Sequence, residues 1–282
     1  SGTRYPYRVQ WSVVGDPETW TGTGSGIIDL IESQDSITAA VLLGDRLFIF
    51  RETSIWELYY VGGTQVFRVR LIASGVGALS PRAIISTAMS IYFLGLDGVY
   101  QFNGSTLKRI DKQVWNLLSG VGERSIVSLS NIRRSFSGYD FLSNRLHLAV
   151  PTSTNDQLGE TLLSYDTIND VWTVRRSQSL TCCGLYNKQV PSASSASWSS
   201  TSYTWDTFPG TWQAEAALAG APVLVFGDSS GYVRAFSDAA VPAQEFTFTT
   251  KDFVFAHAVR LLEVRFLVKA SSFRIRFSYD YG

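Results

Sequence analysis

The side chains best suited to catalysis or metal binding are few in this chain, and most are far apart. There are two histidines, His147 and His257, in separate strand-like stretches, and two cysteines, Cys182 and Cys183, which are adjacent. With so few histidines we expect neither a Ser/His/Asp triad nor a zinc site built on several histidines. Adjacent cysteines cannot close an ordinary disulfide without severe strain. We therefore expect packed or rim histidines, and cysteines on opposite faces of one strand.

Two other stretches contain residue types that are used in catalysis or in phosphate binding. Asp166 and Asp170 have the chemistry of a glycosidase carboxylate pair, but their spacing around Asn169 is typical of a turn. The glycine-rich stretch 22–26 lacks the lysine and the following helix of a phosphate loop, so we interpret it as a flexible connection. The sequence thus predicts no enzyme activity, no catalytic, cofactor-binding or metal-binding residue, and no cofactor.

Composition and charge are those of a folded protein with a large core. The chain has 282 residues, of which 45% are apolar and 13% aromatic, and its 24 basic side chains balance its 24 acidic ones. Zero net charge argues against binding to nucleic acid through counterion release. No apolar run approaches the ~20 residues needed to cross a bilayer, so we expect no membrane-spanning segment.

Alternating polar and apolar residues dominate the chain and predict β-strands. Phe67, Val69 and Leu71 alternate with arginines, so they would face a core from one strand. The same alternation occurs at 261–268 and 273–277. A helix is expected only at 111–118, where Asp111 is placed to cap it. We therefore predict an all-β protein.

An internal repeat narrows the fold class. Residues 47–58 superpose without gaps on 91–102, a shift of 44 residues, and each copy holds two short runs joined by a four-residue turn. Further copies occur at 145–165 and 223–236, with different turn lengths. Each copy follows another apolar run that we predict to be a strand, at 37–43, 83–88, 126–129 and 180–185. Antiparallel units of this length are typical of β-propeller blades.

The repeat predicts a β-propeller of four-stranded antiparallel blades, with four blades visible at 35–78, 79–122, 123–178 and 179–240. The domains are then 1–34 (the end of an earlier blade and a connection), 35–246 (the blades, with a Ser-rich insertion near 190–213) and 247–282 (the start of a separate antiparallel β domain). A pair of β-sandwiches is the alternative architecture. Because the chain lacks an initiator methionine, we expect it to be an interior segment of a longer protein.

Arginine outnumbers lysine and occurs in pairs along the predicted strands. The pairs are Arg68/Arg70, Arg133/Arg134, Arg175/Arg176 and Arg274/Arg276. A guanidinium is planar and weakly hydrated, which favours arginine in interface ion pairs. The pairs would lie either on solvated strand faces or at contacts between subunits.

Several motifs, taken together and in this order, resemble a known family. They are RVQWS at 8–12, GDP at 15–17 and Trp20; DRLFIF at 45–50, SIWE at 54–57 and VGG at 61–63; YFL at 92–94, DGVY at 97–100 and FNG at 102–104; NRLHL at 144–148, YD at 165–166, Trp172, GD at 227–228 and Gly231. The combination is similar to the tail hub or nozzle proteins of short-tailed bacteriophages, also called packaged-DNA stabilisation proteins. The likeness covers most of residues 8–237, and the Ser-rich insertion departs from it.

The resemblance implies a structural virion protein rather than an enzyme. Such a protein carries a β-propeller and forms a homo-oligomeric, commonly hexameric, ring at the end of the phage tail channel, where it retains packaged DNA and gates its ejection. The implied partners are other tail proteins, such as the adaptor, tailspike or fibre, and DNA passing through the lumen without sequence-specific binding. The implied location is the virion tail, after assembly in the host cytoplasm.

Two other functions remain open from the residues. A propeller-fold glycoside hydrolase would bring two or more carboxylates together at one propeller mouth, beside aromatic side chains. A kelch-like protein-binding module would be a monomer that docks partners through its loops.

Overall fold

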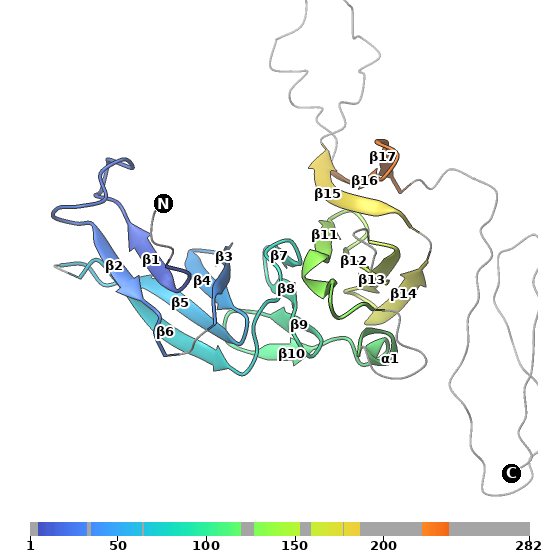
Figure 1. Cartoon of the computed structure of the whole chain (residues 1–282), viewed down its shortest axis with the longest axis horizontal. Helices are drawn as coiled ribbons and strands as arrows, with labels where there is room; N and C mark the ends of the chain where they lie inside the picture. Colours follow the sequence, from blue (N-terminus) through green and yellow to red (C-terminus); the bar gives the residue numbers. More distant parts are fainter. Residues whose placement is uncertain are drawn as a thin grey trace, which may run out of the picture. The chain divides into compact units, whose positions relative to one another are not determined.

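The computed structural model describes residues 5–32, 35–63, 65–119, 127–152, 159–176, 178–186 and 222–236. All of these belong to the first of the two units into which the chain divides, Ser1–Ser237 and Asp238–Gly282. The described part is all-β, as predicted, with one single-turn α-helix and one short 3-10 helix (Figure 1). The predicted Ser-rich insertion and the β domain at 247–282 lie outside the described residues, as do His257, Arg274/Arg276 and the strands expected at 261–268 and 273–277.

Four antiparallel sheets follow one another along the chain, and in each the strands lie in chain order. Sheet 1 contains β3 (Ile37–Leu43), β4 (Arg46–Arg51), β5 (Ser54–Tyr60) and β6 (Phe67–Ser74). Sheet 2 contains β7 (Ile84–Ser86), β8 (Ile91–Leu94), β9 (Val99–Phe102) and β10 (Leu107–Arg109). Sheet 3 contains β11 (Phe136–Asp140), β12 (Arg145–Val150), β13 (Thr161–Asp166) and β14 (Val171–Arg175). The described strands of sheet 4 are β15 (Leu180–Tyr186), β16 (Val223–Asp228) and β17 (Val233–Ala235).

The remaining elements lie before and between these sheets. A hairpin of β1 (Arg8–Trp11) and β2 (Gly26–Asp29) precedes sheet 1, and α1 (Trp115–Leu118) and the 3-10 helix (Ile132–Arg134) lie between sheets 2 and 3. The four predicted repeat units each contain one sheet: sheet 1 in 35–78, sheet 2 in 79–122, sheet 3 in 123–178 and sheet 4 in 179–240.

The first strands of the four sheets are neighbours. β3 contacts β7, β7 contacts β11, and β11 contacts β15 (Figure 1). The hydroxyl of Ser86, at the end of β7, donates to the carbonyl oxygen of Leu42 near the end of β3, at 2.6 Å. Near the opposite ends of these strands, the Ser137 N–H of β11 donates to the carbonyl oxygen of Arg82, at 2.8 Å. β3, β7 and β11 therefore run in the same direction, and the turns that follow these three strands lie at one end.

The core is divided into layers between consecutive sheets. Between sheets 1 and 2, Phe48 packs edge-on to Phe102, with ring centroids 4.9 Å apart. Between sheets 2 and 3, Tyr92 stacks on Tyr139 at 6.0 Å within a larger cluster. A smaller cluster joins sheets 3 and 4. The β1–β2 hairpin packs on the other face of sheet 1 around Trp56. Each sheet thus buries its apolar side chains against the next one along the chain.

The predicted first strand of the third unit, at 126–129, is wrong. The described residues there form no strand, and the first strand of sheet 3 is β11, ten residues later in the chain at Phe136–Asp140. This strand has a weak sequence signal because Gly138 interrupts it. A Cβ at Gly138 would stand 2.8 Å from Leu224 Cδ1 and 3.0 Å from Cys183 Sγ, so glycine permits the close approach of sheet 4.

The predicted helix is shorter than expected, and its predicted cap is wrong. Only Trp115–Leu118 is helical, and Val114 is at the N-cap position without a side-chain hydrogen bond. Asp111 is fully buried, and its Oδ1 accepts a hydrogen bond from Arg109 Nε at 2.7 Å. The carboxylate is therefore used to neutralise a neighbouring arginine rather than to cap the helix.

The prediction that Leu71 faces a core is also wrong: Leu71 pairs with Trp56, but its side chain is largely exposed, and a β-bulge follows it. Ile55 pairs with Ala73 but Trp56 pairs with Leu71, which leaves Ile72 as the extra residue. Ile72 and Ala73 both pack against the cluster between sheets 1 and 2, whereas Leu71 is 44% exposed. A bulge re-aims side chains in this way.

The glycine-rich stretch 22–26 is only partly a connection, since Gly26 belongs to β2 and pairs with Trp11. A Cβ at Gly26 would come within 2.3 Å of the Trp11 ring, so glycine lets the indole lie flat across the strand. The indole N–H of Trp11 donates to the carbonyl oxygen of Gly24 at 3.1 Å. The stretch 22–26 thus helps to hold Trp11 in the β1–β2 hairpin.

Candidate functional site

His147 is packed, as predicted. It lies on β12 and is 3% exposed, and its Nδ1 is 2.8 Å from the hydroxyl of Ser164. Burial lowers the pKa of the imidazole to about 4, so the ring is neutral at pH 7. No group of three or more His, Cys, Asp or Glu side chains in the described residues is arranged to hold a metal ion.

Cys182 and Cys183 are free thiols on opposite faces of β15, as predicted. Cys182 is exposed, whereas Cys183 packs against the cluster between sheets 3 and 4. The thiol of Cys183 donates to the carbonyl oxygen of Ser137 at 3.2 Å, and burial raises its pKa to about 11. Such a thiol is a poor nucleophile at neutral pH.

Asp166 and Asp170 are part of a turn, as predicted. Asp166 Oδ1 accepts the backbone N–H groups of Ile168 and Asn169, each at 3.0 Å. Asp170 Oδ1 accepts the hydroxyl of Tyr165 at 2.6 Å. Both carboxylates are therefore held by their own hairpin, and those hydrogen bonds contribute to the lowered pKa values of both.

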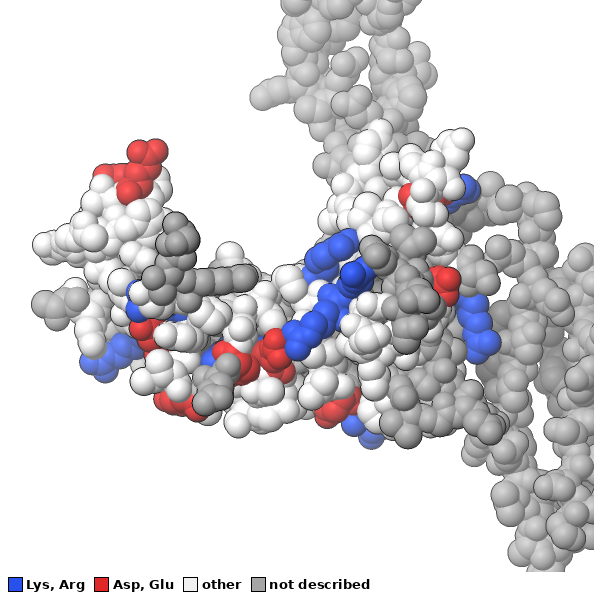
Figure 2. All heavy atoms as spheres, viewed as in Figure 1, with Lys and Arg blue, Asp and Glu red and all other residues white. Residues whose placement is uncertain are grey.

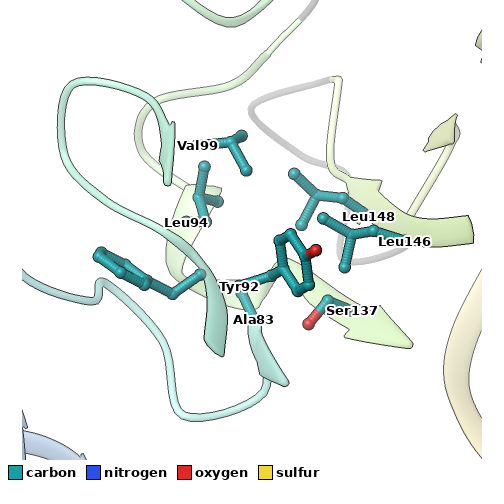
Figure 3. A pocket seen from close by; sticks show the side chains of 8 residues that line it. Ala83, Tyr92, Leu94, Val99, Ser137, Leu146 and Leu148 are labelled. Carbon is teal, nitrogen blue, oxygen red and sulfur yellow. The ribbon is translucent and has the colours of Figure 1, made fainter. Parts of the chain in front are cut away.

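The space between sheets 2 and 3 is apolar and closed. It is lined by Ala83, Tyr92, Phe93, Leu94, Val99, Ser137, Leu146 and Leu148, most of which Figure 3 labels. They come from both sheets, and Tyr92, Leu146 and Leu148 point toward one another (Figure 3), whereas Phe93 belongs to the cluster between sheets 1 and 2. They leave no room for a water molecule. The space is a packing seam rather than a ligand pocket.

Several exposed apolar side chains lie at, or just after, the C-terminal ends of the first strands. They are Leu42 (60% exposed), Met89 (82%), Phe141 (43%), Leu142 (58%), Leu185 (53%) and Tyr186 (55%), and we call this set the apolar rim. Each of the four sheets contributes at least one member. Because exposed apolar groups that cluster mark interaction sites, the apolar rim is the candidate functional surface.

The opposite end of the first strands carries charged contacts between sheets instead. Glu52, in the β4–β5 turn, pairs with Arg133 of the 3-10 helix at 2.6 Å. The Arg82 guanidinium donates to the carbonyl oxygen of Thr181 at 2.8 Å. These side chains join sequence-distant parts of one chain.

Three arginines of the predicted pairs, Arg68, Arg70 and Arg133, also have partners within the chain. Arg70 and Arg46 both bind the carboxylate of Glu57, which is buried between sheets 1 and 2. The two guanidinium groups hold the pKa of Glu57 at about 2. Arg133 is the partner of Glu52 described above, and Arg68 Nε donates to Gln65 at 2.9 Å. These arginines therefore form ion pairs and hydrogen bonds within the chain.

The sequence did not indicate the apolar rim. Turns are expected to be polar. A single apolar residue in a turn, such as Met89, does not indicate a surface patch unless the neighbouring turns are known to lie at the same end of the sheets. The available signal was the repeat itself, since equivalent turns of successive units must lie at the same end.

The face drawn in Figure 2 shows basic and acidic side chains interspersed in small groups, in line with the equal numbers of the two in the chain. No helix in the described residues is long and apolar enough to span a membrane.

Comparison with protein-family models finds no match, and a search of curated proteins finds none either.

Proposed function

We propose that this chain is a structural virion protein, a tail hub or nozzle subunit of a short-tailed bacteriophage. Its copies form a ring, in the hexameric form typical of that group, at the end of the tail channel. The ring retains packaged DNA and gates its ejection. The proposal rests on the ordered motifs at 8–12, 45–63, 92–104 and 144–172, together with the sheet arrangement.

The single observation that carries the proposal is the succession of sheets with adjacent first strands. β3, β7, β11 and β15 contact one another in order, and the first three run in the same direction. Blades of a β-propeller are arranged in this way around a central axis, with the first strand of each blade innermost. We therefore include the propeller in the proposal, with sheets 1 to 4 as blades and the β1–β2 hairpin as the end of an earlier one.

The surface chemistry fits a ring subunit. The sheet edges within a propeller are short and protected, so subunits must join through loops and faces rather than by strand addition. The apolar rim supplies such a face, and its occupant is a neighbouring copy of this chain or another tail protein, such as the adaptor, tailspike or fibre. Zero net charge suits a channel wall, because tight phosphate binding would oppose the passage of DNA.

Light scattering of the purified full-length protein tests the proposal. A mass equal to a closed ring of identical subunits supports it. A stable monomer at every concentration overturns the ring and favours the kelch-like binding module. Hydrolysis of a carbohydrate by the monomer would favour the glycoside hydrolase.

A further inference from the structure

His147 lies in the seam between sheets 3 and 4, among aromatic side chains of the neighbouring sheet. Its ring centroid is 4.8 Å from that of Phe236 in a stacked arrangement, and 5.9 Å from that of Phe226 in an edge-on one. Phe226 lies on β16 and Phe236 directly follows β17. With 3% of its surface exposed, the imidazole is part of the contact that holds sheet 4 in place.

The hydrogen bonding of His147 suits a neutral ring. Nδ1 has a partner in the Ser164 hydroxyl at 2.8 Å, but Nε2 is buried and has no hydrogen-bond partner in the described part of the chain. In an imidazolium both nitrogens are donors. Protonation would therefore place a charged N–H in the seam without an acceptor, which is unfavourable.

The charges near His147 act in both directions: Asp140 favours the protonated imidazole, whereas Arg175 and Arg145 disfavour it. The charged groups on the surrounding strands are Asp140 on β11, Arg145 on β12, Asp166 on β13, Arg175 on β14, Asp228 on β16 and Arg234 on β17, and the Cys183 thiol on β15 is neutral. Four of them form two ion pairs, Arg145 with Asp166 at 3.9 Å and Arg234 with Asp228 at 2.6 Å.

Two of the charged groups, Asp140 and Arg175, take part in neither ion pair. Asp140 accepts hydrogen bonds from its own turn, at Leu142 and Ser143. The guanidinium of Arg175 lies over the Phe236 ring, 4.5 Å from its centroid. Phe236 is thus stacked on His147 and also contacted by Arg175, so a positive imidazole would lie close to an existing cation.

We propose that protonation of His147 opens the seam between sheets 3 and 4, so that this contact is an acid-sensitive release point within the chain. The seams between sheets 1 and 2 and between sheets 2 and 3 contain no histidine in the described residues, and they stay closed. The inference does not depend on the proposed function.

The direction of the pH dependence follows from linkage. Burial lowers the pKa of His147 to about 4 in the closed seam, against 6.5 for an exposed histidine; Asp140 acts in the opposite direction, and Arg175 and Arg145 add to the lowering. The open form therefore binds a proton more readily than the closed form. Opening becomes easier as the pH falls below 6.5, and the effect levels off below about 4.

The thiol of Cys183 reports on the seam, because it packs in the same cluster as Phe226. Cys182→Ser leaves Cys183 as the only thiol of the chain. We would measure the rate at which an aromatic disulfide reagent modifies this thiol between pH 7 and pH 4, normalised to glutathione at each pH. The normalised rate should rise about twenty-fold from pH 7 to pH 5.

Two further variants test whether His147 causes the rise in the modification rate. In the Cys182→Ser background, His147→Gln removes the titrating group, and the normalised rate should then change less than about two-fold over the same range. His257→Gln changes the only other histidine of the chain and should keep the full rise. A flat rate in the parent protein, or an equal rise in His147→Gln, would overturn the proposal.

A direct titration covers the case in which His147→Gln does not fold. The His257→Gln variant has one histidine, so its imidazole C–H resonances report His147 alone. A midpoint well below 6, accompanied by loss of the Phe236 contact, supports the proposal. A midpoint near 6.5 with the seam intact contradicts it.

Discussion

The indole N–H of Trp172 donates a hydrogen bond to the carbonyl oxygen of Ile110 at 2.7 Å, across the boundary between sheets 3 and 2. The backbone N–H of Trp172 also donates to Gln113 Oε1 at 3.1 Å, and Gln113 Nε2 donates in return to the carbonyl oxygen of Asp170 at 2.8 Å. The last strand of sheet 3 is thereby tied to the segment that follows sheet 2. Trp172, which follows the turn between β13 and β14, thus helps to join successive sheets.

Replacing this tryptophan should weaken the junction. Trp172→Phe keeps an aromatic ring but leaves the buried carbonyl oxygen of Ile110 without its donor, so we expect the free energy of unfolding to fall by about 1–3 kcal/mol. Urea denaturation measures the difference. Trp20→Phe, at a half-exposed position, is the matched control and should change stability by less than about 0.5 kcal/mol. Equal stability of both variants would show that the hydrogen bond is unimportant.

Gly77 should not tolerate a side chain. A Cβ there would stand 2.1 Å from the carbonyl oxygen of Arg51 and 2.6 Å from the carbonyl carbon of Glu52, so the connection between sheets 1 and 2 would have to move. We expect Gly77→Ala to cost about 1–3 kcal/mol in thermal or urea unfolding. Gly184→Ala is the control, because nothing lies within 4 Å of its added Cβ. A loss of stability in Gly184→Ala as large as in Gly77→Ala would refute the steric explanation.

Glu57 should stabilise the protein in a pH-dependent way. Its two arginine partners are partly exposed, so we expect Glu57→Gln to cost about 1–2 kcal/mol at pH 7. The pKa of Glu57 is lowered from 4.5 to about 2, so its contribution is complete above pH 4.5 and is lost as the pH falls toward 2. The stability difference between wild type and Glu57→Gln should therefore be smaller at pH 3 than at pH 6. A difference that stays constant would mean that the carboxylate is not held by the arginines.

The apolar rim should control assembly without controlling folding. Met89→Asp combined with Leu142→Asp places charge on two exposed positions of the apolar rim, and we expect association to weaken about tenfold or more, which corresponds to about 1.4 kcal/mol. The melting temperature should hardly change, since neither side chain is buried. Sedimentation at several concentrations gives the association constant.

Leu96→Asp provides the comparison for the apolar rim. Leu96 is 70% exposed in the β8–β9 turn, at the end of sheet 2 away from the apolar rim. This variant should assemble like wild type. If Leu96→Asp disrupts assembly and the apolar-rim variant does not, the contact surface lies at the other end.

Much of the fold was predictable because local signals and tertiary packing agree. Hairpins such as β8–β9, with Asp97 and Gly98 in the turn, combine alternation with turn residues, and both favour the same structure. β11 was missed because Gly138, which sheet 4 requires, removes the strand signal. The bulge at Ile72 was missed because alternation alone carries no information on an extra residue. In both cases contacts distant in sequence overrode the local pattern.

The candidate surface was harder to predict than the fold. The sequence correctly indicated that Asp166 and Asp170 belong to a turn and that Cys182 and Cys183 face opposite ways. It did not indicate that Met89 and Leu142 are exposed at the same end of neighbouring strands, because this depends on the direction of β7 and β11 in space. Clusters formed by separate turns become visible only in three dimensions.

The central claim is that this chain forms a ring in a phage tail, and cryo-EM of the purified particle that contains the full-length protein tests it most directly. We expect a closed ring coaxial with the tail channel, in which each subunit contributes the four successive sheets as propeller blades and the apolar rim is covered by a neighbour. A particle in which the protein is absent from the tail, or is present as isolated copies with the apolar rim open to solvent, would contradict it.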